Sequence, residues 1–419
     1  MKHKWLLAGA FAFFAGLFAP QAVDLPASRA EAAYHTMRFN WDVVPGAVQY
    51  ELVLLKGPED TKENVVSRHR EIFTAGTTID ISGLKEPVGD YYWKVCGQDF
   101  HGNYIGRFTE PRPLSEGTEE NPVAPKPTTQ FEQMDYMPLY PVFSWIPQAY
   151  ARHHEVRVCN ASSGACIRTL QAGENDIYED SGYTYPGRYY WQVRSLNADG
   201  YPMSDWSEPS YFEIGSGATP VAALGDSITH GGGAVSVPPG YLLYDWETYS
   251  PVPVKNLGYS GNTTAEMLAR FESDVLPWQP RVLVIMGGVN DFRLGVQGWE
   301  TVANLEAMKA KCAAYGIIPV FVTATPINPE YMTHRIAGIE VPPYDWQEHM
   351  KYINGWVLSQ QYSLDVASAL QDGSGCLRRD YTTDGLHPDY YGKKFIGESI
   401  GSYLQQHFGW IVNGLQKKS

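Results

Sequence analysis

Two parts of this 419-residue chain repeat one pattern about 100 residues apart, and an internal repeat constrains a fold strongly. FNW at residues 39–41 returns as FSW at 143–145, and GDYYWKV at 89–95 returns as GRYYWQV at 187–193. Both copies consist of short alternating runs rich in Val, Tyr and Trp, separated by Gly, Pro, Asn and Asp. Such runs are typical of the strands of a β-sandwich of about 100 residues. The sequence therefore predicts two all-β sandwiches.

The two copies resemble fibronectin type III and related immunoglobulin-like modules. The resemblance rests on an early tryptophan in each copy, Trp41 and Trp145, and on the late G-x-Y-Y-W-x-V strand. It implies one module at residues 34–115 and a second at 130–215. The proline-containing stretch 116–129 has the composition of a linker between them.

From about Thr219 the pattern changes, because apolar runs now alternate with longer helical periodicities. This alternation predicts an α/β domain over residues 219–419, with a parallel sheet and helices on both faces. Parallel sheets carry their sites at the carboxyl ends of the strands. The expected strands are 221–224, 254–257, 282–286, 317–322 and 364–366, and the expected helices are 264–271, 300–315, 347–362 and 390–408.

Two motifs of this domain carry the parts of a nucleophilic site. Ser227 follows the first expected strand, and Asp384 and His387 lie three residues apart near the C-terminus. A serine needs an adjacent base to act as a nucleophile, and histidine titrates near neutrality. A carboxylate beside the histidine fixes its tautomer. We therefore expect Ser227 as nucleophile, His387 as base and Asp384 as its orienting partner.

Four segments in order make the domain resemble the SGNH hydrolases, also called GDSL esterases. They are GDS at 225–227, NLGYSGNTT at 256–264, GVND at 288–291 and DGLHP at 384–388. The resemblance implies a three-layer, flavodoxin-like fold and a serine esterase. It also implies an oxyanion hole made by the main-chain N–H groups of Ser227 and Gly261 and the side-chain amide of Asn290. No metal or organic cofactor is needed for this chemistry.

Several aromatic residues are candidates for substrate binding. Tyr244 and Trp246 lie between the first two motifs, and Tyr259 lies within the second. Aromatic faces suit sugar rings, although ordinary packing explains them equally well. We expect an esterase that removes acetyl groups from a polysaccharide. The alternatives are a lipolytic esterase or lysophospholipase of the same family, and a surface glycan-binding protein with a vestigial hydrolase domain.

The N-terminus has the pattern of a secretory signal peptide over residues 1–32. Lys2 and Lys4 precede an apolar run at 6–18, and the small residues Ala30 and Ala32 follow. The alternative is an N-terminal membrane anchor. We expect cleavage and a secreted or cell-surface protein without membrane insertion. The net charge of −14 disfavours nucleic acid as a partner, leaving an acylated carbohydrate or small ester.

Five cysteines are too few for a disulfide scaffold, and none has metal-ligand spacing. Cys159 and Cys166 flank a turn-rich stretch. They form a disulfide if the flanking strands pair, which an exported protein permits, or they remain free thiols. His230 follows the serine motif in the run HGGG and has no companion ligands, so we expect an ordinary loop histidine rather than a metal ligand.

Overall fold

The computed structural model describes residues 35–85, 88–233, 237–415 and 417. Residues Ala33–Ser419 belong to one compact unit. The predicted signal peptide at residues 1–32 lies outside the described residues. The predicted boundaries of the two modules and the α/β domain stay predictions, and the regions are described below by their observed elements.

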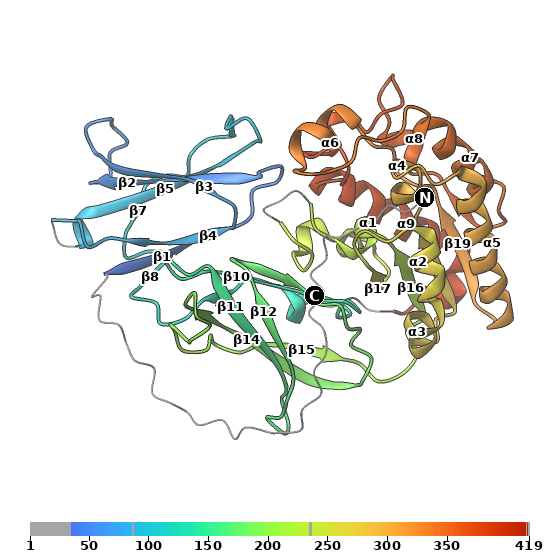
Figure 1. Ribbon diagram of the computed structural model, residues 1–419, viewed down its shortest axis with the longest axis horizontal. Coiled ribbons are helices and arrows are strands. Elements are labelled where there is room, and N and C mark those ends of the chain that lie inside the picture. Colours follow the sequence, from blue (N-terminus) through green and yellow to red (C-terminus); the bar gives the residue numbers. More distant parts are fainter. Residues whose placement is uncertain (1–34, 86–87, 234–236, 416, 418–419) are drawn as a thin grey trace. The chain divides into compact units, whose positions relative to one another are not determined.

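The first β module, residues 36–120, consists of antiparallel strands (Figure 1, blue to cyan). One sheet has the order β4-β1-β8 and the other has β3-β2-β5-β6, with β7 also pairing with β5. Phe39 and Trp93 lie in its own hydrophobic cluster, with ring centroids 5.4 Å apart. The strands are β1 Thr36–Asn40, β2 Gln49–Lys56, β3 Val65–Ile72, β4 Gly76–Asp80, β5 Tyr91–Gln98, β6 Tyr104–Ile105, β7 Arg112–Pro113 and β8 Thr118–Glu120.

The second β module, residues 126–214, is also antiparallel, with sheets ordered β13-β10-β9 and β12-β11-β14-β15. Phe143 packs against Trp191 with ring centroids 5.0 Å apart, as Phe39 does against Trp93 in the first copy. Cys159 and Cys166 form a disulfide where β11 pairs with β12. The strands are β9 Lys126–Pro127, β10 Val142–Ile146, β11 His153–Asn160, β12 Cys166–Ala172, β13 Asp176–Tyr178, β14 Gly187–Leu196 and β15 Ser210–Ile214.

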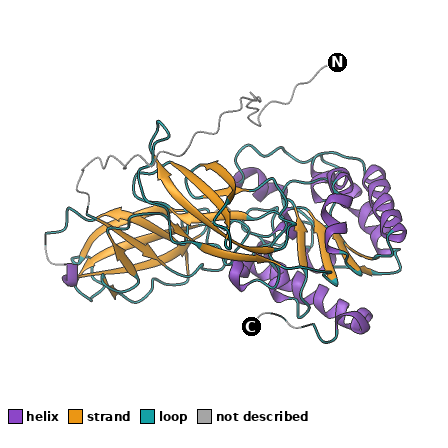
Figure 2. Ribbon diagram, turned by 90° about the horizontal axis from the view of Figure 1, so that it is seen from below, coloured by secondary structure: helices purple, strands orange, loops and turns teal. Residues whose placement is uncertain are grey.

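The C-terminal region has the predicted parallel sheet, in the order β17-β16-β18-β19-β20. Helices cover both faces of this sheet (Figure 2). Three of its strands, β16, β17 and β18, are buried along their whole length, as expected of strands covered on both faces. The strands are β16 Val221–Gly225, β17 Lys255–Gly258, β18 Val282–Met286, β19 Ile318–Val322 and β20 Ser363–Leu364.

The helices of this region follow the predicted pattern with local differences. The expected helix 264–271 is two short helices that meet at Arg270, and α6 was not expected, although Asn328 followed by Pro329 is a helix-start pattern. The helices are α1 Ser227–His230, α2 Thr264–Ala269, α3 Phe271–Val275, α4 Val289–Arg293, α5 Gly298–Ala314, α6 Pro329–Arg335, α7 Trp346–Leu358, α8 Ala367–Leu370 and α9 Tyr390–Val412.

The second module and the α/β region share a single hydrophobic cluster, which joins Phe143 and Trp191 to residues of the parallel sheet. Main-chain hydrogen bonds also join the two regions, from Leu139 N–H to Asn256 O at 3.0 Å and from Gln130 N–H to Gly240 O at 3.0 Å. The segment before β10 is therefore packed directly against the edge strand β17 and the loop that contains Gly240.

Candidate active site

The adjacent strands β17, β16 and β18 place three sequence-predicted residues together at the carboxyl edge of the sheet. Ser227 begins α1 just after β16, Gly261 follows β17, and Asn290 lies in α4 after β18. Asp226 caps α1, because its carboxylate accepts the Ile228 N–H at 2.9 Å. This cap holds Ser227 at the first position of the helix.

Ser227, His387 and Asp384 form a continuous hydrogen-bonded chain. His387 Nε2 lies 3.1 Å from Ser227 Oγ, and His387 Nδ1 lies 2.7 Å from Asp384 Oδ2. Asp384 Oδ1 accepts the main-chain N–H groups of Leu386 and His387, each at 2.8 Å. With its proton on Nδ1, His387 has a free lone pair on Nε2. The arrangement can therefore accept the Ser227 proton.

The environment of Asp384 keeps this carboxylate ionised. Burial alone raises its pKa, but the neighbouring His387 and the hydrogen bonds that Asp384 accepts outweigh burial. The net effect lowers the pKa of Asp384 below its ordinary value. An ionised Asp384 stabilises a positive charge on His387 when that ring takes up a proton.

The predicted oxyanion donors lie beside this chain. Gly261 has a φ of +86°, a left-handed conformation that favours glycine, and a Cβ there would meet no atom within 4 Å. The need for glycine therefore comes from the backbone conformation. Asn290 is buried, its Nδ2 donates to Asn262 O at 2.9 Å, and its Oδ1 accepts from Arg293 Nε at 2.8 Å. Arg293 thus fixes which end of the amide is the donor.

His230 supports the loop that carries Gly261. Its Nε2 lies 2.6 Å from the main-chain oxygen of Tyr140, so Nε2 bears the proton, and its Nδ1 accepts from Ser260 N–H at 3.2 Å. Burial lowers the pKa of His230 to about 4, which keeps the ring neutral. The sequence indicated an ordinary loop histidine; the structure has a buried one at the end of α1.

Arg270 is a second supporting residue that sequence reasoning missed. Its Nη2 donates to Gly225 O and its Nη1 to Leu257 O, both at 2.7 Å, and its Nε donates to Asn262 Oδ1 at 2.6 Å. One side chain thus ties the ends of β16 and β17 to the loop after Gly261. Nothing in the local motif distinguishes this arginine from a surface arginine of an amphipathic helix.

A cavity of about 390 Å³ opens over Ser227 and His387. Strand β13 of the second module contributes to its wall together with the loops after β16, β17 and β18. The residues that line it are Asp176, Tyr178, Ser227, Gly231, Gly232, Gly233, Val237, Pro238, Pro239, Ser260, Gly261, Asn290, Arg293, Ile336, Ile339, Asp384, Leu386 and His387.

The assignment of Tyr244 and Trp246 as substrate-binding residues is wrong. Their side chains are 2% and 0% exposed, and the Tyr244 hydroxyl accepts the Gly46 N–H at 3.1 Å. They are packing residues. Tyr259 is partly buried and contacts the ring of Tyr140 edge-on at 4.7 Å, and it is absent from the described lining of the cavity.

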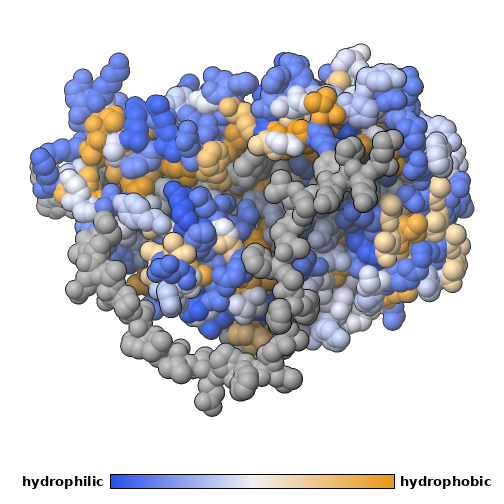
Figure 3. Space-filling model, viewed as in Figure 1, coloured by the Kyte–Doolittle hydropathy of each residue, from blue (hydrophilic) through white to orange (hydrophobic). Residues whose placement is uncertain are grey.

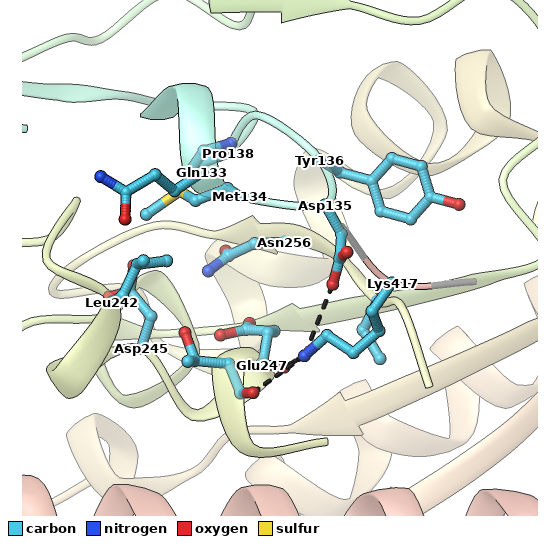
Figure 4. Close-up of a pocket in the computed structure, with 12 residues that line it drawn as sticks. Gln133, Met134, Asp135, Tyr136, Pro138, Leu242, Asp245, Glu247, Asn256 and Lys417 are labelled. Atoms are coloured by element: carbon cyan, nitrogen blue, oxygen red, sulfur yellow. Dashed lines mark hydrogen bonds and ion pairs between the residues drawn. The ribbon is translucent and has the colours of Figure 1, made fainter. Parts of the chain in front are cut away.

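The described residues that line a second cavity, of about 250 Å³, do not include Ser227, His387 or Asp384 (Figure 4). Lys417 enters it and its Nζ lies 3.4 Å from the Asp135 carboxylate. The same Nζ donates to the main-chain oxygens of Glu247, Thr248 and Ser250 at 3.0, 2.8 and 2.8 Å. These contacts anchor Lys417 against the segment around η4 (Trp246–Tyr249) and the segment before β10.

Within the described ranges, no group of three or more His, Cys, Asp or Glu side chains is placed to hold a metal ion. No helix in the described part of the chain combines the length and apolarity needed to cross a membrane.

A parallel α/β sheet with a serine, a histidine and an aspartate hydrogen-bonded at its carboxyl edge defines the class of α/β serine hydrolases. Residues 223–395 match the model of the GDSL-like Lipase/Acylhydrolase family. The resemblance to GDSL hydrolases predicted from the four motifs is thereby confirmed for the C-terminal region.

The chain is also similar to an uncharacterised lipoprotein of Bacillus subtilis, with 34% identity over 80 residues. That match covers 18% of this chain and 33% of the lipoprotein, so the chain spans a third of that relative's length.

Solved structures of similar proteins include three hydrolases. A lipase/acylhydrolase from Enterococcus faecalis has 22% identity and a TM-score of 0.36, covering 44% of this chain and 95% of that chain. A GDSL-like lipase from Bacteroides thetaiotaomicron has 20% identity and a TM-score of 0.35, with 44% and 87% covered. An acetylxylan esterase from Geobacillus stearothermophilus has 19% identity and a TM-score of 0.34, with 45% and 95% covered.

Proposed function

We propose that the protein is an exported serine esterase that removes acetyl groups from a polysaccharide. The observation that carries the esterase part is the hydrogen-bonded chain from Ser227 Oγ through His387 to Asp384 in a domain of the GDSL-like family. The acetyl and polysaccharide parts are supported by the lining of the cavity, which includes the carboxylate of Asp176 and the aromatic ring of Tyr178 beside Ser227.

The reaction proceeds in two halves through an acyl-enzyme. Ser227 Oγ attacks the ester carbonyl while His387 Nε2 takes its proton, and the carbonyl oxygen becomes an oxyanion. The main-chain N–H groups of Ser227 and Gly261 and the Asn290 amide donate to that oxyanion. His387 then gives the proton to the departing alcohol oxygen. A water molecule, deprotonated by His387, attacks the acetyl group, and acetate leaves as Ser227 regains its proton.

The β modules are proposed to be fibronectin type III-like sandwiches that lie between the export signal and the catalytic domain. Two antiparallel sheets in each module, and the matching Phe–Trp pairs Phe39–Trp93 and Phe143–Trp191, support this assignment. The similarity to a lipoprotein is consistent with an exported protein.

A lipolytic esterase or lysophospholipase of the same family is the second candidate. Ile336, Ile339 and Leu386 give the cavity an apolar side that suits an acyl chain. A surface glycan-binding protein with a vestigial hydrolase domain is the third candidate. The intact hydrogen bonds of the Ser227–His387–Asp384 chain argue against it.

The deciding experiment compares p-nitrophenyl esters from acetate to palmitate, and acetate release from acetylated polysaccharides, for the wild type and Ser227→Ala. We expect activity on acetate, release of acetate from a polysaccharide, and loss of both in the variant. A maximum at long acyl chains would move the assignment to a lipolytic esterase. Glycan retention by a full-length protein that hydrolyses no ester would favour the binding protein.

A further inference from the structure

Strand β13 brings two side chains of the second module into the active-site cavity. Successive residues of a strand point to opposite faces. Ile177 packs against the hydrophobic cluster that the second module shares with the α/β region, so Asp176 and Tyr178 point to the opposite face. Both line the cavity that contains Ser227. A segment about 50 residues before the nucleophile therefore forms part of its surroundings.

The position of this strand is fixed by the α/β region. β13 pairs with β10, which follows the segment packed on the site loops. Thr128 accepts from the Tyr241 hydroxyl at 2.7 Å, and Gln130 Oε1 accepts the Leu242 N–H at 2.9 Å. The main-chain oxygen of Tyr140, two residues before β10, accepts from His230. The wall formed by β13 is thus attached to the same residues that support the oxyanion loop.

The two side chains combine a hydrogen-bond acceptor with an aromatic ring. Asp176 is partly buried; burial raises its pKa, and no described residue offsets this with a hydrogen bond or a positive charge. Its carboxylate therefore has unused capacity to accept hydrogen bonds. Tyr178 is 49% exposed, and its ring contacts His230 edge-on with centroids 5.9 Å apart.

We propose that Asp176 and Tyr178 bind the alcohol part of the ester and make the enzyme selective for esters of a hydroxylated ring, such as a sugar. This inference rests on the proposed esterase function and names its substrate class. Ring hydroxyls donate to the Asp176 carboxylate, and the Tyr178 ring packs against the C–H face of the sugar. An alkyl chain offers no donors and would remove water from the carboxylate without replacing it, which is unfavourable.

The test compares two acetate esters that differ in the alcohol part. One is a methyl glucoside carrying a single acetyl group and free hydroxyls, and the other is p-nitrophenyl acetate, whose leaving group has no hydroxyl. The variants are Asp176→Ala and Tyr178→Ala, with Tyr185→Ala as a control for a tyrosine of the same module that is 81% exposed. Circular dichroism and thermal unfolding establish that each variant is folded.

We expect each of the two variants to lower kcat/KM for the glucoside ester by about tenfold or more, mainly through KM, since a hydrogen bond to a charged group is lost in Asp176→Ala. Asp176→Ala keeps p-nitrophenyl acetate hydrolysis within about twofold of wild type, since that leaving group has no hydroxyl to donate. Tyr178→Ala loses more on the glucoside ester than on p-nitrophenyl acetate, and Tyr185→Ala changes neither rate. Equal losses on both esters, or no loss on either, would refute the role of β13. A wild type that hydrolyses p-nitrophenyl acetate but not the glucoside ester would also refute it while leaving the esterase function standing. If the wild type hydrolysed neither ester, the proposed esterase function itself would be refuted.

Discussion

Replacing Asn290 by alanine tests the oxyanion hole. The loss of the oxyanion donor lowers kcat, whereas the loss of the hydrogen bonds to Asn262 and Arg293 lowers the stability of the fold. The side chain is 1% exposed, and Arg293 holds its Oδ1 so that Nδ2 is the end available as a donor. Nδ2 donates to Asn262 O in the free protein, and the proposed reaction redirects this donor to the oxyanion. The negative oxygen exists only during the reaction, so its stabilisation raises kcat rather than substrate affinity.

The expected size follows from the loss of one donor. Removing a single oxyanion-hole donor costs about 2.7–4 kcal/mol of transition-state stabilisation, or about 100- to 1,000-fold in kcat. KM should change little. Asn290→Ala also leaves Arg293 Nε and Asn262 O without this partner, which destabilises the fold by about 1–3 kcal/mol.

The assay is steady-state hydrolysis of p-nitrophenyl acetate together with thermal unfolding. Asn354→Ala is the matched control, because Asn354 is a buried asparagine that accepts from Ala324 N–H at 2.8 Å and donates to Ala324 O at 3.0 Å. The control should lose similar stability and keep its kcat. If Asn290→Ala kept kcat within about threefold of wild type, the assignment of Asn290 to the oxyanion hole would be refuted.

Three further predictions concern the titrating groups and the disulfide. Asp384→Asn should lower kcat at neutral pH by about 10,000-fold. Because the pKa of Asp384 is lowered in the folded state, the ionised carboxylate stabilises the fold fully above about pH 4, and this stabilisation is lost as pH falls through the folded pKa. In thermal unfolding, the stability difference between the wild type and Asp384→Asn should therefore shrink in acid. Burial raises the pKa of Asp245 to about 7, so the folded state retains a proton that the unfolded state releases near pH 4. Relative to Asp245→Asn, the wild type should lose up to about 1.4 kcal/mol of stability per pH unit between pH 4 and 7, and parallel curves in thermal unfolding would contradict this. Replacing both Cys159 and Cys166 by serine should lower stability by about 2–3 kcal/mol in denaturant titrations and leave esterase kinetics intact.

The sequence could propose residues for the site because each belongs to a motif with its own local chemistry. Ser227 follows a buried apolar run, and Asp384 lies close enough in sequence to His387 for a direct hydrogen bond. What the sequence did not contain is the order of the strands. Gly261 and Asn290 meet Ser227 because β17 and β18 flank β16, and that adjacency follows from packing of the whole sheet.

The aromatic residues show where sequence reasoning failed. Tyr244 and Trp246 lie between two motifs in the sequence, yet their exposure depends on packing against distant residues such as Gly46. Tyr178 lies in no motif, and a tyrosine in a strand is ordinary, so the sequence does not single it out. Its place in the cavity depends on how the second module packs on the site loops, which no local pattern encodes.

The most direct test of the proposed mechanism is to identify the residue that carries the acyl group. The protein is treated with a fluorophosphonate, which reacts irreversibly with activated serines, and the labelled peptide is mapped by mass spectrometry as hydrolysis of p-nitrophenyl acetate is followed. We expect one label per chain, on Ser227, with activity lost in proportion to labelling. Label on another residue, or full activity after Ser227 is labelled, would contradict the mechanism.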